Sequence, residues 1–159
     1  MGDPAPDFDL PALIDGVRKT WRLSAHHGHR IVLAFYPFNW KEVSARQLQS
    51  YQSARPRLIA CHVETVGITV DSIMNTTAWE REIGPFKFPI CSDFWPHGEV
   101  CRRYGLLKDH GEDAGSALRA VVGVNEAGNI AFRKIYFAEE VPALEDVLSA
   151  LNSVEQGAS

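Results

Sequence analysis

The chain has 159 residues, of which 45% are hydrophobic and 23% charged, a composition typical of one globular domain with a sizeable core. Its formal net charge of -4 gives no long-range attraction to phosphate backbones or anionic lipids, so we expect neither nucleic acid nor membrane surfaces as partners. The cysteines Cys61, Cys91 and Cys101 are irregularly spaced and odd in number. We therefore expect reduced thiols rather than a secreted disulfide framework.

No apolar run approaches the roughly 20 residues that span a bilayer. The first residues also lack a basic segment followed by an apolar core, which is the pattern of a secretory signal. Both observations predict a cytoplasmic protein.

The first part of the chain predicts strands. Phe8 and Leu10 alternate with polar residues in a proline-rich opening, as in a short edge strand. Asp15-Gly16 is a hairpin-turn signal, and residues 17–23 alternate as a second strand. Residues 31–36 are a continuous apolar run, which is typical of a strand covered on both faces.

After Pro37 the apolar residues recur at helical spacing, and we expect a helix that starts close to residue 44 and is kinked or broken at Pro56. The remaining elements are predicted as a strand at 65–70, a helix capped by Asp71 or Ser72 and running through 83, a brief strand at 88–91, a helix at 97–104, strands at 118–124 and 129–136, and a terminal helix at 142–151. This alternation predicts an α/β layer sandwich with helices on both faces of a mixed sheet. We assign residues 1–154 to a single domain and 155–159 to a frayed tail.

Several separated motifs resemble the peroxiredoxin (AhpC/TSA) family, and most closely its one-cysteine alkyl hydroperoxide reductase E or bacterioferritin comigratory protein type. Residues 2–8, Gly-Asp-Pro-Ala-Pro-Asp-Phe, look like the opening of the family, and residues 88–98 are similar to a segment of that type. Pro37 matches the proline that begins the family's Pro-x-x-x-Thr-x-x-Cys loop. The resemblance implies a thioredoxin-like three-layer sandwich with an N-terminal β-hairpin extension, and it places Arg119 at the position of the family's active-site arginine.

The chain differs from the family at the positions of the reacting residues. Counting from Pro37, Ser44 occupies the position of the peroxidatic cysteine and Lys41 that of the motif threonine. In the family a thiolate attacks the peroxide and becomes a sulfenic acid, whereas a serine hydroxyl is hardly ionised and cannot be oxidised in this way. Because Lys41 and Glu42 differ as well, we favour a natural loss of the cysteine over a laboratory substitution.

Three functions follow as hypotheses. In the first, the protein lacks thiol-peroxidase activity and keeps the pocket, with Lys41, Ser44, Gln47 and Arg119, as a binding or regulatory site for a small anion or a peroxide-like ligand. Gln47 either hydrogen-bonds the arginine or faces solvent. In the second, the protein is an active peroxidase that uses an external thiol reductant, either because the serine replaced a cysteine in the laboratory or because Cys101 or another thiol has assumed the role. In the third, the chain is a structural or partner-binding subunit. None of the three requires a cofactor.

Two other groups of residues suggest further sites. Cys101 lies on the helix where some peroxiredoxins carry a resolving cysteine, but an ordinary part-buried thiol is the simpler interpretation. His26-His27-Gly28-His29 has no cysteine or carboxylate at matched spacing, so we expect a solvated turn and no metal.

The loops Phe38-Asn39-Trp40 and Phe94-Trp95-Pro96 carry aromatic residues outside any periodic face. Aromatic side chains are enriched at interface centres, and the corresponding loops commonly form a dimer face in the family. We therefore expect a homodimer.

Overall fold

The computed structural model describes the backbone of residues 2–157 and the side chains of residues 2–152. The strands are β1 (Asp9–Ile14), β2 (Val17–Arg22), β3 (Arg30–Phe35), β4 (Val63–Thr69), β5 (Ile90–Ser92), β6 (Ala120–Val124) and β7 (Ile130–Ile135). The helices are α1 (Glu42–Ser53), α2 (Arg55–Ala60), α3 (Ile73–Ile83), α4 (Glu99–Arg103) and α5 (Leu144–Gly157), with a short 3-10 helix at Leu23–His26.

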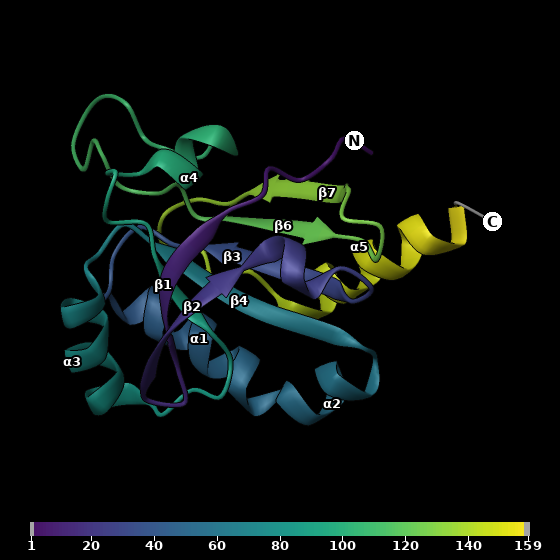
Figure 1. The fold of residues 1–159 in the computed structure, drawn as a ribbon, viewed down its shortest axis with the longest axis horizontal. Helices are drawn as coiled ribbons and strands as arrows, with labels where there is room; N and C mark the ends of the chain where they lie inside the picture. Colours follow the sequence, from purple (N-terminus) through teal and green to yellow (C-terminus); the bar gives the residue numbers. More distant parts are fainter. Residues whose placement is uncertain (1, 158–159) are drawn as a thin grey trace.

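The strands form one mixed seven-stranded sheet in the order β2-β1-β5-β4-β3-β6-β7 (Figure 1). Strand β3 pairs parallel to β4, and β4 pairs parallel to β5, whereas all other neighbours are antiparallel. Parallel neighbours need long crossover connections, and here α1 with α2 connects β3 to β4 while α3 connects β4 to β5. The predicted mixed α/β sandwich with an N-terminal hairpin is confirmed.

Strand β3 shows how the sheet is covered on both faces. Val32 and Ala34 pack into the core beneath α1, α2, α3 and α5, whereas Ile31, Leu33 and Phe35 pack toward α4 and the N-terminal hairpin. All five side chains are almost completely buried. The continuous apolar run predicted such a strand, because side chains alternate between the two faces of a sheet.

The helices differ from the prediction mainly at their ends. The helix after Pro37 begins at Glu42, and Pro56 lies in the first turn of the separate helix α2, where a missing amide proton is tolerated. Ser72 caps α3 by accepting a hydrogen bond from the Asn75 amide at 3.1 Å. Helix α4 is shorter than predicted and follows Gly98, which has a positive φ of 65°.

The C-terminal helix extends beyond the predicted end at residue 151. Its backbone is helical through Gly157, so residues 155–157 of the predicted tail continue α5, and residues 158–159 lie outside the described part of the chain. No helix among the described residues is long and apolar enough to cross a lipid bilayer.

Candidate functional site

The candidate site lies at the carboxyl ends of the parallel strands, where open α/β sheets commonly bind ligands. The chain leaves β3 at Phe35, passes through Pro37 and enters α1 at Glu42. Lys41 is the N-cap residue, with extended backbone angles of φ -94° and ψ 136°, and its side chain makes no capping hydrogen bond. The first amides of α1 are therefore not capped by this side chain, and the positive end of the helix dipole faces the site.

Arg119 connects the elements around the site. Only 3% of this residue is exposed, and it precedes β6 directly. Its Nη2 donates to Ser44 Oγ at 3.0 Å and its Nη1 donates to Gln47 Oε1 at 2.7 Å, while its Nε donates to the Ala138 carbonyl at 2.9 Å. A guanidinium carries five N–H donors, so two remain beyond these three bonds.

The hydrogen bonds continue from Arg119 into the core through α1. Gln47, which is fully buried, donates from Nε2 to the Tyr51 hydroxyl at 3.0 Å. Burial raises the pKa of Tyr51 to about 12. Burial lowers the pKa of the Arg119 guanidinium, an effect that the nearby Glu139 carboxylate opposes. Arginine remains protonated in proteins, so the site holds a buried positive charge with neutral hydrogen-bond partners.

A cavity of about 290 Å³ lies beside Arg119, which forms part of its lining. It is lined by Pro37, Phe38, Lys41, Glu42, Val43, Lys108, Asp113, Ser116, Ala117, Leu118, Arg119, Tyr136, Ala138 and Glu139. Ser44 and Gln47 are not part of this lining; both are fully buried and bonded to Arg119. A molecule in the cavity would therefore meet Arg119 before it met the serine.

The charges around the cavity are only partly paired. Glu42 accepts a hydrogen bond from Arg46 one helical turn further along α1, at 2.5 Å. Within the described side chains, Lys41 and Lys108 form no hydrogen bond or ion pair through their ammonium groups. The pocket thus combines the buried charge of Arg119 with two uncommitted lysine charges. Its lining also includes the exposed carboxylates of Asp113 and Glu139, which likewise form no hydrogen bond or ion pair with the described side chains.

Asn39 fixes the loop that leads into the site. This residue is 3% exposed, and its backbone amide donates to Asp71 Oδ2 at 2.6 Å. Its side-chain amide donates to Thr76 Oγ1 at 2.9 Å and to Asn75 Oδ1 at 3.1 Å, and its Oδ1 accepts from the Tyr36 hydroxyl at 2.8 Å. The loop after β3 is therefore tied to the loop after β4 and to α3.

The other residues singled out from the sequence lie elsewhere. Cys101 is fully buried in the core on the face of the sheet opposite α1, and burial raises its thiol pKa, as does the nearby Asp93 carboxylate. A raised pKa disfavours the reactive thiolate. His26 stacks on Trp21 and hydrogen-bonds Glu64 at 3.1 Å. Among the described residues, no group of three or more histidines, cysteines and carboxylates is close enough to hold a metal ion.

Sequence reasoning missed the parts of the site that come from distant segments. Lys108 follows α4, and the carbonyl group of Ala138 follows β7. A backbone carbonyl has no side-chain signature, and no local pattern around Lys108 indicates that it faces the start of α1. Only the folded chain shows that β7 leads to Ala138 beside Arg119 and that Lys108 lines the same cavity as Lys41.

Comparisons with known proteins identify the family. Residues 1–133 match the AhpC/TSA family. The chain is 31% identical to "Putative peroxiredoxin sll0755" of Synechocystis sp., over 98% of this chain and 80% of that protein. It is 30% identical to peroxiredoxin-2 of Bos taurus over 80% of this chain, a match that spans only 65% of the bovine protein.

The solved structures agree with this relationship. The fold superposes on the reduced 2-Cys peroxiredoxin of Plasmodium vivax with a TM-score of 0.89 at 21% identity, covering 98% of this chain and 82% of that one. It superposes on AhpC of Enterococcus faecalis with a TM-score of 0.88 at 25% identity, covering 99% and 93%. With its mixed sheet, its N-terminal hairpin and its family match over most of the chain, this protein belongs to the AhpC/TSA, or peroxiredoxin, family with a thioredoxin-like fold.

Proposed function

We propose that this protein is a peroxiredoxin-family member without thiol-peroxidase activity, in which Ser44 stands at the peroxidatic position and the pocket beside it binds a small anion. The observation that carries the proposal is the hydrogen bond from Arg119 to Ser44 in the first turn of α1. A peroxidase of this family needs a thiolate at that point, and the hydroxyl of Ser44 cannot supply one.

The surroundings of Ser44 do not activate it as a nucleophile either. Its hydroxyl accepts from the cationic Arg119, and a serine nucleophile needs an adjacent general base. The described side chains provide no histidine or carboxylate that hydrogen-bonds Ser44. The hydroxyl thus acts as a hydrogen-bond acceptor that positions the guanidinium.

Anion binding is supported by the charges that converge on the cavity. Arg119 has two N–H donors beyond its three hydrogen bonds, and the side chain lines the cavity. Lys41 and Lys108 add positive charge and the start of α1 adds its dipole, and together with the buried Arg119 these outweigh the exposed carboxylates Asp113 and Glu139 of the same lining. A carboxylate, sulfate or phosphate group fits this chemistry, because planar guanidinium donors bind such oxygens well.

The loss of peroxidase activity is tested by peroxide consumption with dithiothreitol as the reductant. The unchanged protein is expected to show the same slow background as a Ser44→Ala variant, which reports any reaction of the other thiols. Rapid consumption by the unchanged protein but not by Ser44→Ala would overturn the proposal. A Ser44→Cys variant that gains activity would show that the rest of the pocket still supports the family chemistry.

The anion site is tested by titrating inorganic sulfate at constant ionic strength. We expect sulfate to raise the melting temperature, and Lys41→Gln and Lys108→Gln each to weaken binding about two- to fivefold, the effect of one exposed charge pair. Lys19→Gln, on the exposed side of the hairpin, is the matched control and leaves the affinity unchanged. Equal loss in all three variants would show only a general charge effect and would contradict a defined site.

A homodimer through the aromatic loops remains a second proposal. Trp40 is 54% exposed, and Phe94 and Trp95 are 52% and 79% exposed. Trp40 donates from Nε1 to Asn75 of α3 at 2.9 Å, and the neighbouring Met74 is 70% exposed, so this end of the molecule carries several large apolar side chains. Apolar residues of this kind mark interfaces. Sedimentation that shows a monomer at all concentrations would refute the dimer.

A further inference from the structure

A second cavity, of about 300 Å³, lies away from the Arg119 pocket, beneath the N-terminal hairpin. Its apolar lining includes Trp21, Tyr51, Leu58, Val63, Val66 and Phe88. These side chains come from both faces of the sheet, since Trp21 and Val66 belong to the core near α4 whereas Tyr51 and Leu58 come from α1 and α2. The cavity therefore extends from one face of the sheet to the other, past the edge of a strand.

The length of β5 explains this opening. Strand β5 pairs with β4 only at Gly67, Ile68 and Thr69, and the first residues of β4 have no strand on that side. The Gly67 amide donates to the Pro89 carbonyl at 2.9 Å, which shows that Gly67 faces β5. Because the backbone groups of alternate residues in a strand face the same neighbour, the Thr65 backbone also faces the side of β5, at a level before the first residue of β5. The space beside Thr65 is the cavity.

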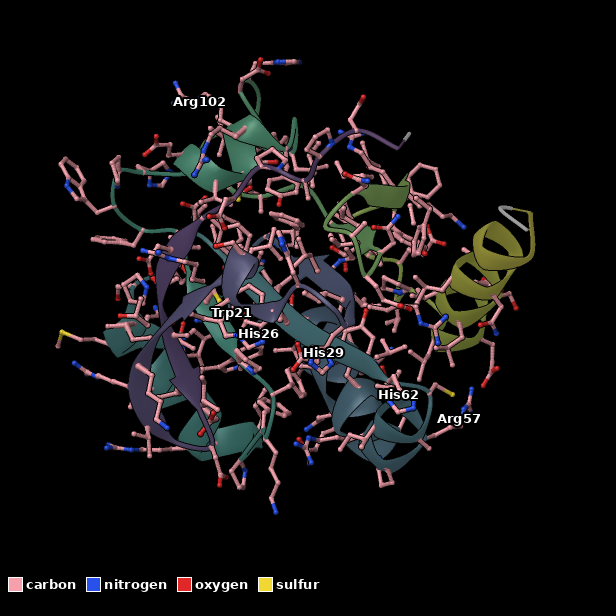
Figure 2. All side chains as sticks on the ribbon, turned by 45° about the vertical axis from the view of Figure 1, so that its right-hand side comes forward. Trp21, His26, His29, Arg57, His62 and Arg102 are labelled. Atoms are coloured by element: carbon pink, nitrogen blue, oxygen red, sulfur yellow. The ribbon has the colours of Figure 1, made fainter. Side chains whose placement is uncertain are left out.

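Aromatic rings form much of the wall. The rings of Trp21 and His26 stack with centroids 4.6 Å apart and an interplanar angle of 20° (Figure 2). On the other side Phe88 meets Tyr51 edge to face, with centroids 6.3 Å apart. Pockets that bind small molecules are lined mainly by such apolar and aromatic side chains, with few polar groups that set orientation.

The charged side chains of the lining that form no hydrogen bond or ion pair with described residues are cationic. Glu64 is already engaged, because its carboxylate hydrogen-bonds His26. Arg55 and Lys87 also line the cavity, and no hydrogen bond or ion pair joins either side chain to another described residue. Lys87 is exposed and Arg55 half-buried, so both charges lie near the mouth.

We propose that this cavity is a binding site for a small planar aromatic carboxylate. The aromatic body packs between Trp21 and Phe88, and the carboxylate lies at the mouth near Arg55 and Lys87. Aromatic rings interact favourably with other rings beyond the burial of their area, and an anion is favoured because the free charges here are cationic. The cavity volume falls at the lower end of the range for small-molecule pockets, which suits a compound of one or two fused rings.

The proposal is tested by measuring the binding of 2-naphthoate with calorimetry and with the NMR resonance of the Trp21 indole N–H. The Trp21→Phe variant assigns this resonance, because it lacks the indole. A dissociation constant of about 0.1–1 mM is expected for a ligand of this size. The neutral analogue 2-naphthalenemethanol is expected to bind the unchanged protein more weakly. The absence of saturable binding up to about 5 mM would overturn the proposal.

Matched variants separate the charges from the apolar wall. The double variant Arg55→Gln/Lys87→Gln is expected to weaken 2-naphthoate binding about tenfold while leaving the neutral analogue unaffected. The control Lys19→Gln/Arg102→Gln removes the same net charge from exposed positions outside the cavity (Figure 2 labels Arg102) and leaves both affinities unchanged. Ile59→Glu places a negative charge at an exposed lining position and is expected to abolish binding of the anion.

Two outcomes would assign the ligand elsewhere and overturn the proposal. One is a loss of 2-naphthoate binding in Lys41→Gln/Lys108→Gln, which would place the ligand in the Arg119 pocket. The other is an equal loss in the Arg55→Gln/Lys87→Gln variant and its charge-matched control. Melting temperatures of all variants show whether the fold is intact, and the exposed or half-buried positions chosen are tolerant of such changes.

Discussion

Gln47 offers the sharpest test of the hydrogen-bond chain behind the pocket. A Gln47→Leu substitution keeps a side chain of similar size but leaves Arg119 Nη1 and the Tyr51 hydroxyl without their partner. Hydrogen bonds to charged groups contribute about 1.5–3 kcal/mol and neutral ones about 0.5–1.5 kcal/mol. The gain from a more apolar buried side chain offsets about 1 kcal/mol of this loss. We therefore expect the free energy of unfolding to fall by roughly 1–3.5 kcal/mol.

Urea unfolding followed by tryptophan fluorescence measures this change. With a slope of about 2 kcal/mol per molar urea, a loss of about 2 kcal/mol lowers the midpoint by about 1 M. Gln49→Leu is the matched control on the same helix, because Gln49 is exposed and its side chain makes a single long hydrogen bond, of 3.4 Å, to the described residues. Gln47→Glu keeps the acceptor for Arg119, and its second carboxylate oxygen can accept from the Tyr51 hydroxyl in place of the bond that Gln47 donates, so this variant is expected to recover most of the loss.

A double-mutant cycle distinguishes the chain of hydrogen bonds from two unrelated contacts. Tyr51→Phe removes the hydroxyl that accepts from Gln47, so the loss in Gln47→Leu/Tyr51→Phe is expected to be smaller than the sum of the two single losses. If Gln47→Leu is no less stable than Gln49→Leu, the buried guanidinium does not depend on the amide, and the chain of hydrogen bonds from Arg119 to Tyr51 does not stabilise the fold.

Three further predictions concern the cap, the buried acid and the thiols. Ser72→Ala is expected to cost about 1 kcal/mol in urea unfolding, because it removes the hydroxyl that caps α3, whereas Ser53→Ala at the exposed end of α1 changes little. Burial raises the pKa of Glu80 above its ordinary value of 4.5, so the folded state binds this proton more tightly than the unfolded state, and the group costs stability as the pH rises above that value. Glu80→Gln should therefore be more stable relative to the unchanged protein at pH 7 than at pH 4, and the same difference at both values would contradict this. Of the three thiols, only Cys61 is exposed, and a thiol reagent is expected to modify one group rapidly in the native protein and none in Cys61→Ser.

The elements that the sequence predicted well are those with a local cause. The apolar run at residues 31–36 predicted a strand buried on both faces, and Asp15-Gly16 predicted the hairpin turn, because each depends on residues that are adjacent in the chain. The start of α1 was predicted to within two residues of its position from the change of period after Pro37. The order of strands and helices was sufficient to predict the mixed sandwich.

The sequence could not predict features that depend on how distant elements meet. The Ala138 carbonyl binds Arg119 only because β7 lies beside β6, and a carbonyl group has no sequence signature. The cavity beneath the hairpin exists because β5 begins only opposite Gly67 and leaves the start of β4 without a strand on that side, and strand ends are set by the paired register rather than by local preference. The position of Ser44 behind Arg119, outside the cavity lining, also depends on how α1 meets the segment before β6, so only the folded protein shows it.

The hydrogen bonds of Asn39 have a consequence for the timing of binding. They hold the loop after β3 against α3 and the loop after β4, so the rim of the Arg119 pocket is already ordered in the free protein. A ligand then pays little conformational entropy to organise its own site, and its arrival is governed by diffusion and charge. Since a loop held in this way cannot close over a bound ion, the residence time depends on contacts with the site. A small anion should therefore exchange rapidly with solvent.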